Sequence, residues 1–123
     1  GNLLKRKISE FNVTCWLVNT GWSGGVYGVG KRISIKDTRQ LLNEALNGNL
    51  LNIEMRKDDN FGFEIPKSVN GIDSNILSPR DCWSDPVAYD EQAIKLVNMF
   101  IENFKKFETD VDENIKSAGP IIN

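Results

Sequence analysis

A glycine-rich, basic stretch from Gly21 to Arg39 is the part of the sequence best suited to binding chemistry. It contains five glycines, the residue that favours positive φ angles and close backbone contacts. The cations that follow the glycines are Lys31, Arg32, Lys36 and Arg39. Asp37 is the only acid among them, and a helix beginning near Ser34 or Ile35 would add free N–H groups and a partial positive charge. Together these features predict an anion or nucleotide site.

Part of this stretch comes close to the phosphate-binding loop of P-loop nucleotide triphosphatases. Gly25, Gly30 and Lys31 have the spacing of that loop. Arg32, however, stands where a serine or threonine should bind magnesium, so we interpret the match as a near miss. The alternative to a binding site is a glycine-rich connection whose cations face water, as charged runs commonly do.

An apolar run before the glycines predicts the strand that positions them. Residues Cys15–Val18 are apolar in succession, which indicates a strand over about 14–19 covered on both faces. The glycines would then form a strand-to-helix passage, the place where α/β proteins bind ligands.

The helix after the glycines has recognisable ends. Ser34 and Asp37 have capping-box spacing and predict a helix over about 36–47, which an Asn-Gly pair at 47–48 would end. The residues expected on its buried side are Leu41, Leu42, Ala45 and Leu46. Packing of this helix on a sheet would hold the glycine loop in place.

Three further helices and two strands follow from the hydrophobic pattern and the helix-start signals. An amphipathic helix opens the chain over residues 3–11. The alternating segments 52–56 and 61–65 favour a hairpin. An Asp-Pro pair starts the longest helix, about 86–107, and a short helix covers about 111–117. The apolar stripe of the long helix, expected to be core, is Ile94, Leu96, Val97, Phe100, Ile101, Phe104 and Phe107.

Composition excludes several kinds of chemistry. The sequence has no histidine, so it offers neither Ser-His-Asp nor Cys-His catalysis and lacks the commonest transition-metal ligand. Its two cysteines have neither the number nor the spacing of a disulfide framework or a zinc site, and we expect free thiols. The loop acids to which we assign no chemistry are Asp58, Asp59, Asp73 and Asp81.

Charge and hydropathy also limit the partners. A net charge of -2 gives no general attraction to nucleic acid or to an anionic membrane, so neither is expected as a partner. No apolar run approaches the length of a membrane span, and the first residues lack the layout of a secretory signal. We therefore expect a cytoplasmic protein.

The segment Leu17–Arg39 resembles the nucleotide-binding segment near the C-terminus of ATP-dependent phosphoenolpyruvate carboxykinases. The resemblance is long and rich in rare residues, and it continues in weaker form almost to the end of the chain. The weaker stretches are Ala45–Gly48, Ile76–Arg80, Phe100–Phe104 and Ser117–Pro120.

The resemblance implies an activity for the parent enzyme. Members of that family convert oxaloacetate and ATP to phosphoenolpyruvate, carbon dioxide and ADP in gluconeogenesis, using magnesium and often manganese. Their kinase P-loop, metal ligands and oxaloacetate-binding residues lie upstream of the part that resembles this chain. We therefore expect residues 1–123 to be a single partial domain that is inactive alone and folds stably only against the remainder of the carboxykinase chain.

The resemblance also implies three ligand contacts at the adenine and ribose end of ATP: Arg32 and Ile33 beside the base, and Thr38 from the helix. Arginine can stack on a base and donate several fixed hydrogen bonds, but Arg32 could also simply be exposed. Ile33 could cover the purine or pack in the core. The Thr38 hydroxyl could bind the nucleotide or only its own helix backbone. No catalytic or metal-binding residue is expected here.

The fold expected is α/β, a mixed-sheet fragment of the carboxykinase C-terminal mononucleotide-binding domain. One buried strand, a hairpin and three or four helices supply too few strands for a complete sheet, so the missing strands would belong upstream. One alternative is a stand-alone, non-catalytic nucleotide- or anion-binding module. Another is a protein-interaction domain that uses Trp16, Trp22 and Trp83.

Overall fold

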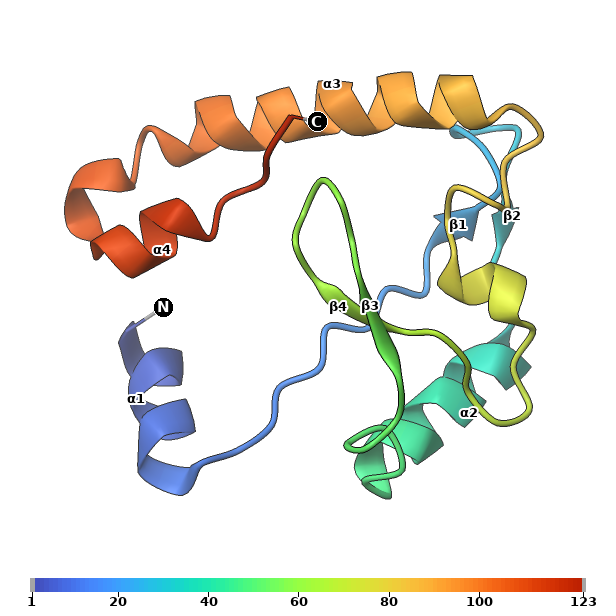
Figure 1. The fold of residues 1–123 in the computed structure, drawn as a ribbon, viewed down its shortest axis with the longest axis horizontal. Coiled ribbons are helices and arrows are strands. Elements are labelled where there is room, and N and C mark those ends of the chain that lie inside the picture. The colour runs from blue at the N-terminus through green and yellow to red at the C-terminus, as the bar shows by residue number, and fades with distance from the viewer. Residues whose placement is uncertain (1, 123) are drawn as a thin grey trace.

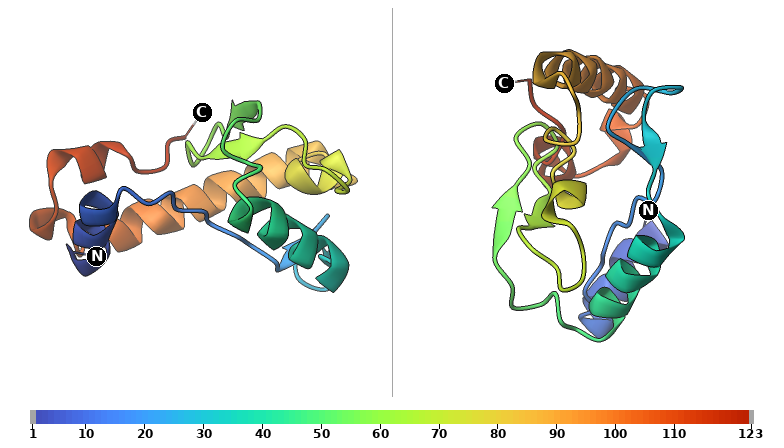
Figure 2. Two further views of the ribbon diagram at one scale, coloured as in Figure 1. Left: turned by 90° about the horizontal axis from the view of Figure 1, so that it is seen from below. Right: turned by 90° about the vertical axis from the view of Figure 1, so that its right-hand side faces the viewer.

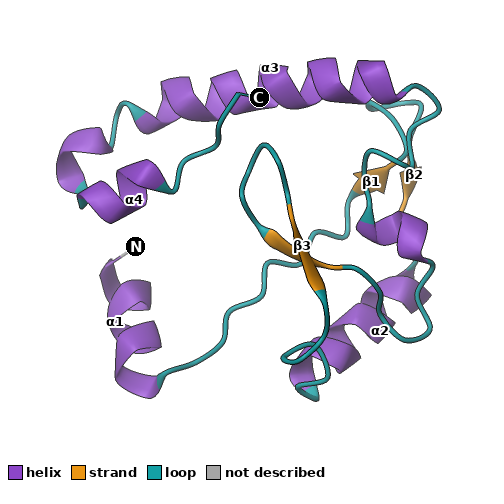
Figure 3. Cartoon of the chain, viewed as in Figure 1, coloured by secondary structure: helices purple, strands orange, loops and turns teal. Residues whose placement is uncertain are grey.

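The computed structural model describes residues 2–122 as a small mixed α/β arrangement (Figure 1). In chain order the elements are α1 (Asn2–Phe11), β1 (Trp22–Ser23), β2 (Lys31–Arg32), α2 (Ile35–Leu46), β3 (Met55–Lys57), β4 (Glu64–Pro66), the 3-10 helix η1 (Ser74–Leu77), α3 (Pro86–Phe104), the 3-10 helix η2 (Glu108–Asp110) and α4 (Glu113–Ser117). Long loops join them (Figure 3). The described strands form two separate antiparallel pairs, β1 with β2 and β3 with β4. The α/β class is therefore confirmed, but the expected mixed sheet does not form among residues 2–122, where both strand pairs are antiparallel.

The ends of α2 are set by local hydrogen bonds, as the sequence predicted. The Ser34 hydroxyl accepts a hydrogen bond from the Asp37 N–H at 3.0 Å and donates to the Asp37 carboxylate at 2.6 Å. At the other end, Gly48 has a φ of 75°, and the N–H groups of Gly48 and Asn49 donate to the carbonyls of Ala45 and Glu44. That pair of bonds is a Schellman motif, and it ends the helix.

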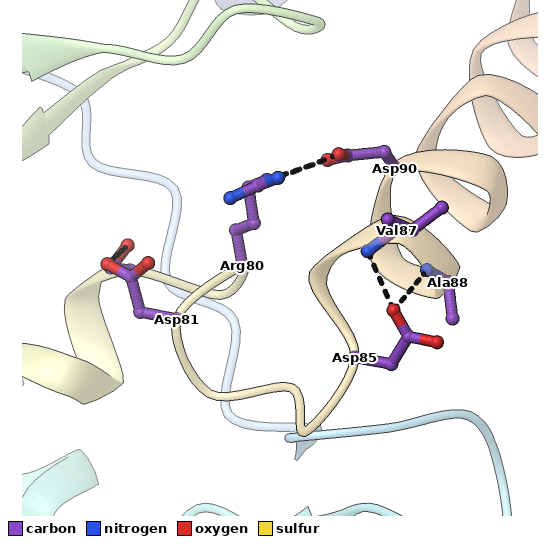
Figure 4. Close-up of polar contacts among 7 residues, drawn as sticks. Arg80, Asp81, Asp85, Val87, Ala88 and Asp90 are labelled. Atoms are coloured by element: carbon purple, nitrogen blue, oxygen red, sulfur yellow. Dashed lines mark hydrogen bonds and ion pairs between the residues drawn. The ribbon is translucent and has the colours of Figure 1, made fainter.

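The long helix α3 begins where expected and ends three residues earlier than 107. Asp85 caps it by accepting hydrogen bonds from the N–H groups of Val87 and Ala88, at 2.9 and 3.2 Å (Figure 4). Pro86 fills the first helical position, where its missing N–H costs nothing.

Only part of the apolar stripe on α3 is core. Val97 is fully buried, and Ile101 and Phe104 are half-buried. The prediction was wrong for the residues that the structure leaves exposed, which are Ile94, Leu96, Phe100 and Phe107. One side of α3 has no covering layer in residues 2–122, because no two helices there pack extensively on each other.

The predicted hairpin is confirmed, although each strand begins three residues later and ends one residue later than expected. Met55 pairs with Pro66 and Lys57 pairs with Glu64. The Asp58 carboxylate accepts hydrogen bonds from two backbone N–H groups of the connecting turn. In Figure 1, α3 runs along the top of the molecule, the hairpin lies below it, and α2 lies lower still, to the right. The right-hand view of Figure 2 also shows α3 at the top and α2 near the bottom.

A small hydrophobic cluster forms beside α2. Its buried members are Leu50, Val69 and Ile72. From α2, Leu41 and Ala45 pack against the cluster, as predicted. The prediction was wrong for Leu42 and Leu46, because both are exposed, Leu46 by 83%.

The predicted strand over 14–19 is not formed. Residues 13–20 run as extended chain without regular structure, Cys15 is exposed, and the exposed fraction of Leu17 is 80%. Only Trp16 of this run packs against the hydrophobic cluster. A strand needs neighbours for its N–H and C=O groups, and within residues 2–122 none pairs with this run.

The accessible surface is large for the mass. The chain has a mass of 13.9 kDa and exposes 9516 Å². A folded monomer of that mass is expected to expose about 6,700 Å². The excess, about 2,800 Å², is of the size that an extensive protein interface buries.

We expect the 123-residue chain alone to unfold over a broad temperature range. Its described core holds five buried hydrophobic residues, which is too few to support a cooperative transition. Near-UV circular dichroism of the tryptophans against temperature, with binding of an apolar dye, would test this. A single sharp melt with no dye binding at low temperature would contradict it.

Candidate functional site

The glycine-rich stretch forms a β-hairpin followed by α2. Trp22 lies opposite Arg32, Ser23 lies opposite Lys31, and the Ile33 N–H donates to the Gly21 carbonyl at 3.1 Å. The sequence pattern predicts that the glycines join a strand directly to a helix. That detail was wrong, because they join two short paired strands, and Ile33 and Ser34 then connect β2 to α2.

Backbone contacts in this hairpin leave no room for a side chain at Gly24 or Gly30. A Cβ atom on the buried Gly30 would lie 2.7 Å from the Gly25 carbonyl oxygen. A Cβ on Gly24, which has a φ of 81°, would lie 3.0 Å from the carbonyl oxygen of Cys82. The hairpin therefore packs against the loop before α3 through bare backbone.

The geometry agrees with a near miss rather than a P-loop. In a P-loop the glycine-rich segment runs directly into a helix, and its backbone N–H groups and lysine surround the phosphates. Here Lys31 lies in β2, opposite Ser23, and α2 begins only at Ile35.

Four cations around β2 and α2 are exposed and have no acidic partner in the described part of the chain. Within residues 2–122, no ion pair engages Lys31, Arg32, Lys36 or Arg39. The nearest acid in sequence, Asp37, is engaged with the Ser34 hydroxyl. Since their charges are unneutralised, these side chains can attract an anion.

The three predicted contact residues all lie in the connection between β2 and the first turn of α2. Arg32 is exposed, and Ile33 and Thr38 are half-buried. The Thr38 N–H donates to the Ser34 carbonyl, whereas its hydroxyl makes no hydrogen bond within the described chain. The Ile33 N–H donates within the hairpin, so of the two backbone groups of Ile33 only the carbonyl remains for a ligand.

Two exposed aromatic residues of this hairpin were not assigned as ligand contacts from the sequence. The rings of Trp22 and Tyr27 meet edge to face, with centroids 5.8 Å apart at 74°. Their exposed fractions are 54% and 89%. In the sequence, each of these aromatics has a glycine beside it. Such glycines indicate a turn, but they do not tell which residues pair across the two strands.

A cavity of about 340 Å³ lies elsewhere, between the β3–β4 hairpin and the start of α3. Its lining residues are Arg56, Asp58, Asp59, Asn60, Ser78, Pro79, Arg80, Tyr89, Asp90 and Ile94. None of the three predicted contact residues lines it. The cavity therefore does not coincide with the predicted site.

The charged groups of that cavity largely bind the protein itself. Arg80 donates to both carboxylate oxygens of Asp90, at 2.8 and 2.9 Å (Figure 4), and this contact lowers the pKa of Asp90 and raises that of Arg80. Arg56 donates to the Leu77 carbonyl at 2.7 Å. Burial raises the pKa of the Tyr89 hydroxyl, so this group stays neutral.

The loop acids have structural partners of the same kind. Asp58 caps the hairpin turn and Asp73 caps η1, while Asp81 accepts a hydrogen bond from the Ser78 hydroxyl at 2.6 Å. In the described part of the chain, no three His, Cys, Asp or Glu side chains cluster as a metal site would need.

Cys15 and Cys82 are free thiols, as expected. Among residues 2–122, no helix combines the length and apolarity needed to cross a bilayer.

Comparisons with known proteins agree with one another. The family model described as phosphoenolpyruvate carboxykinase matches residues 1–75. A relative from Brucella suis biovar 1 is 60% identical over 122 residues, and one from Rhizobium leguminosarum bv. trifolii is 61% identical over 120 residues. A third, from Parvibaculum lavamentivorans, is 59% identical over 120 residues. All three are named phosphoenolpyruvate carboxykinase (ATP).

The alignments cover nearly all of this chain but a minor part of each relative. They include 99% of the chain and 23% of the Brucella suis protein, and 98% of the chain and 22% of each of the other two. The chain thus spans less than a quarter of the length of these relatives. With a family-model match over residues 1–75 and about 60% identity along the sequence, the chain belongs to the ATP-type phosphoenolpyruvate carboxykinase family.

Proposed function

We propose that this chain is the C-terminal part of the nucleotide-binding domain of a longer carboxykinase, where it binds the adenine and ribose end of ATP. The complete enzyme would convert oxaloacetate and ATP to phosphoenolpyruvate, carbon dioxide and ADP. The observation that carries this proposal is the connection from β2 to α2. Within residues 2–122, the exposed guanidinium of Arg32 has no ion pair, the Thr38 hydroxyl makes no hydrogen bond, and no acid pairs with the surrounding cations.

Arg32 supplies the strongest interaction in this proposal. Its planar guanidinium can lie against the face of a purine and donate hydrogen bonds to the ribose or phosphate oxygens. Because no protein acid engages it in residues 2–122, binding a nucleotide would not require an ion pair to be broken first.

Ile33 and Thr38 would orient the bound nucleotide. The Ile33 N–H is taken by Gly21, which leaves a carbonyl to face the ligand. Adenine presents an amino donor where guanine presents an oxygen acceptor, so a carbonyl at this place favours ATP over GTP. The Thr38 hydroxyl can both donate and accept, which suits a ribose hydroxyl.

The chain would contribute to the reaction by positioning the nucleotide. Loss of carbon dioxide from oxaloacetate leaves an enolate oxygen that takes the terminal phosphoryl group of ATP, and fixing the nucleotide aligns that group for transfer. Magnesium and manganese would bind to residues of the longer chain, with the P-loop. Alone, the 123 residues would be inactive.

The rest of the longer chain would also complete the fold. The accessible surface exceeds the expected value by about 2,800 Å², and the apolar run Cys15–Val18 has no strand beside it in residues 2–122. Both features suit a segment that docks on further strands. They disfavour the alternative of a stand-alone nucleotide- or anion-binding module.

A cytoplasmic setting belongs to the same proposal, since Cys15 and Cys82 are unpaired.

The Arg32→Ala variant of the full-length carboxykinase is expected to bind ATP about tenfold more weakly, because a charged hydrogen bond and a stacking contact are lost. Isothermal titration with ATP measures this. Arg6→Ala is the matched control, since Arg6 is also exposed and unpaired in the described chain but lies on α1. Unchanged ATP affinity in Arg32→Ala would remove Arg32 from the site.

The Thr38→Val variant, which keeps the side-chain shape and loses the hydroxyl, should weaken ATP binding by about three- to tenfold, the range of one hydrogen bond. Thr38→Ser keeps the hydroxyl and should bind ATP nearly as the parent does. If valine is tolerated as well as serine, the hydroxyl does not contact the nucleotide.

A further inference from the structure

The strand register brings an aromatic pair to the same side of the hairpin as Arg32. Trp22 lies directly opposite Arg32 across the β1–β2 ladder. Side chains of directly opposed residues project from the same face, with Cβ atoms about 5 Å apart. The Tyr27 ring meets the Trp22 ring edge to face, so Tyr27 lies beside the residue that stands opposite Arg32. We call the rings of Trp22 and Tyr27 the aromatic platform.

The backbone holds the platform toward solvent. The Val29 N–H donates to the Val26 carbonyl at 3.0 Å, which closes a turn with Tyr27 and Gly28 at its centre. Gly28 has a φ of 91°, a conformation that favours glycine at the third position of a turn. The fold thus keeps an 89% exposed tyrosine at the corner of an ordered turn, although exposing an aromatic ring is unfavourable.

We propose that Trp22 and Tyr27 are additional ligand contacts: the purine ring of the nucleotide bound by Arg32 stacks on the face of Trp22, and the Tyr27 ring, nearly perpendicular to Trp22, contacts the edge of the purine. This inference rests on the proposed function and names two contact residues that it lacked.

The surroundings of the platform favour a nucleotide as its partner. An aromatic ring offers a π-face that any base can stack on, and a guanidinium beside it adds a second planar contact. Lys31, Lys36 and Arg39, which have no ion pair in the described chain, are close in sequence to this surface and suit the phosphates attached to a purine. A purely apolar partner would gain nothing from these charges.

Titration of the full-length carboxykinase with ATP tests the platform. Tyr27→Ala is expected to weaken ATP binding about tenfold, whereas Tyr27→Phe keeps the ring and should bind ATP as the parent does. Tyr27→Leu keeps apolar surface without a ring and should resemble Tyr27→Ala. If Tyr27→Ala binds ATP normally while Arg32→Ala does not, the platform is overturned and the proposed function stands. If neither variant changes the affinity, the proposed function itself fails.

Tryptophan fluorescence gives a second test, in which the unsubstituted enzyme carries the signal and Trp22→Phe is the control. Stacking on Trp22 should quench its emission when ATP binds, and Trp22→Phe identifies that part of the signal. Inorganic tripolyphosphate carries the charge without the base, and it should leave the Trp22 emission unchanged. Equal quenching by ATP and tripolyphosphate, or no quenching by either, would show that the purine does not stack there.

Discussion

The close backbone approach at Gly30 is the constraint on which the geometry of the candidate site depends. Gly30 is buried between the backbones of Gly25 and Ser23, at distances that exclude any side chain. This contact closes the hairpin and fixes the register that places Trp22 opposite Arg32. Two residues after Arg32, Ser34 caps α2, so hairpin and helix are joined with almost no free chain. A short connection of this kind holds side chains in place with little loss of entropy on binding.

The molecule has two polar regions, and they differ in whether their charged side chains already have partners in the protein. In the cavity beside α3, Arg80 binds Asp90, Arg56 binds a carbonyl, and Asp58 caps a turn. Near β2 and α2 the cations have no acidic partner in residues 2–122. Charged groups with partners stabilise loops against a helix, whereas charged groups without partners can attract a ligand of opposite charge. This difference, rather than concavity, identifies the hairpin as the candidate site.

The extent of the surface bears on how such a site could work. Helices and hairpins here share few contacts, and large apolar side chains such as Leu17 and Leu46 are open to water. A ligand bound at the β1–β2 hairpin would contact this chain on one side and solvent on the other. We infer that further chain of the carboxykinase covers the other side and excludes water, which would strengthen each electrostatic contact made by Arg32.

Local signals in the sequence determined the elements whose ends depend on neighbouring residues. The Ser34 and Asp37 pair started α2, the Asn-Gly pair ended it, and Asp85 with Pro86 started α3. Each of these devices works through hydrogen bonds within a few residues, so composition and spacing are sufficient to find it. The family also followed from the sequence, through the residues around Arg32.

Tertiary structure decided whatever depends on a partner distant in sequence. The apolar run before Gly21 indicated a buried strand, but a strand forms only where another strand accepts its hydrogen bonds, and residues 2–122 provide none. Helical spacing predicted that Leu46 and Phe100 are buried, but both are exposed. The reason is similar, because the apolar stripe of a helix is buried only where a second layer of structure covers it. The alignment of Trp22 with Arg32 also came from the fold alone, because the register of a ladder is set by pairing across the turn and not by the order of residues along the chain.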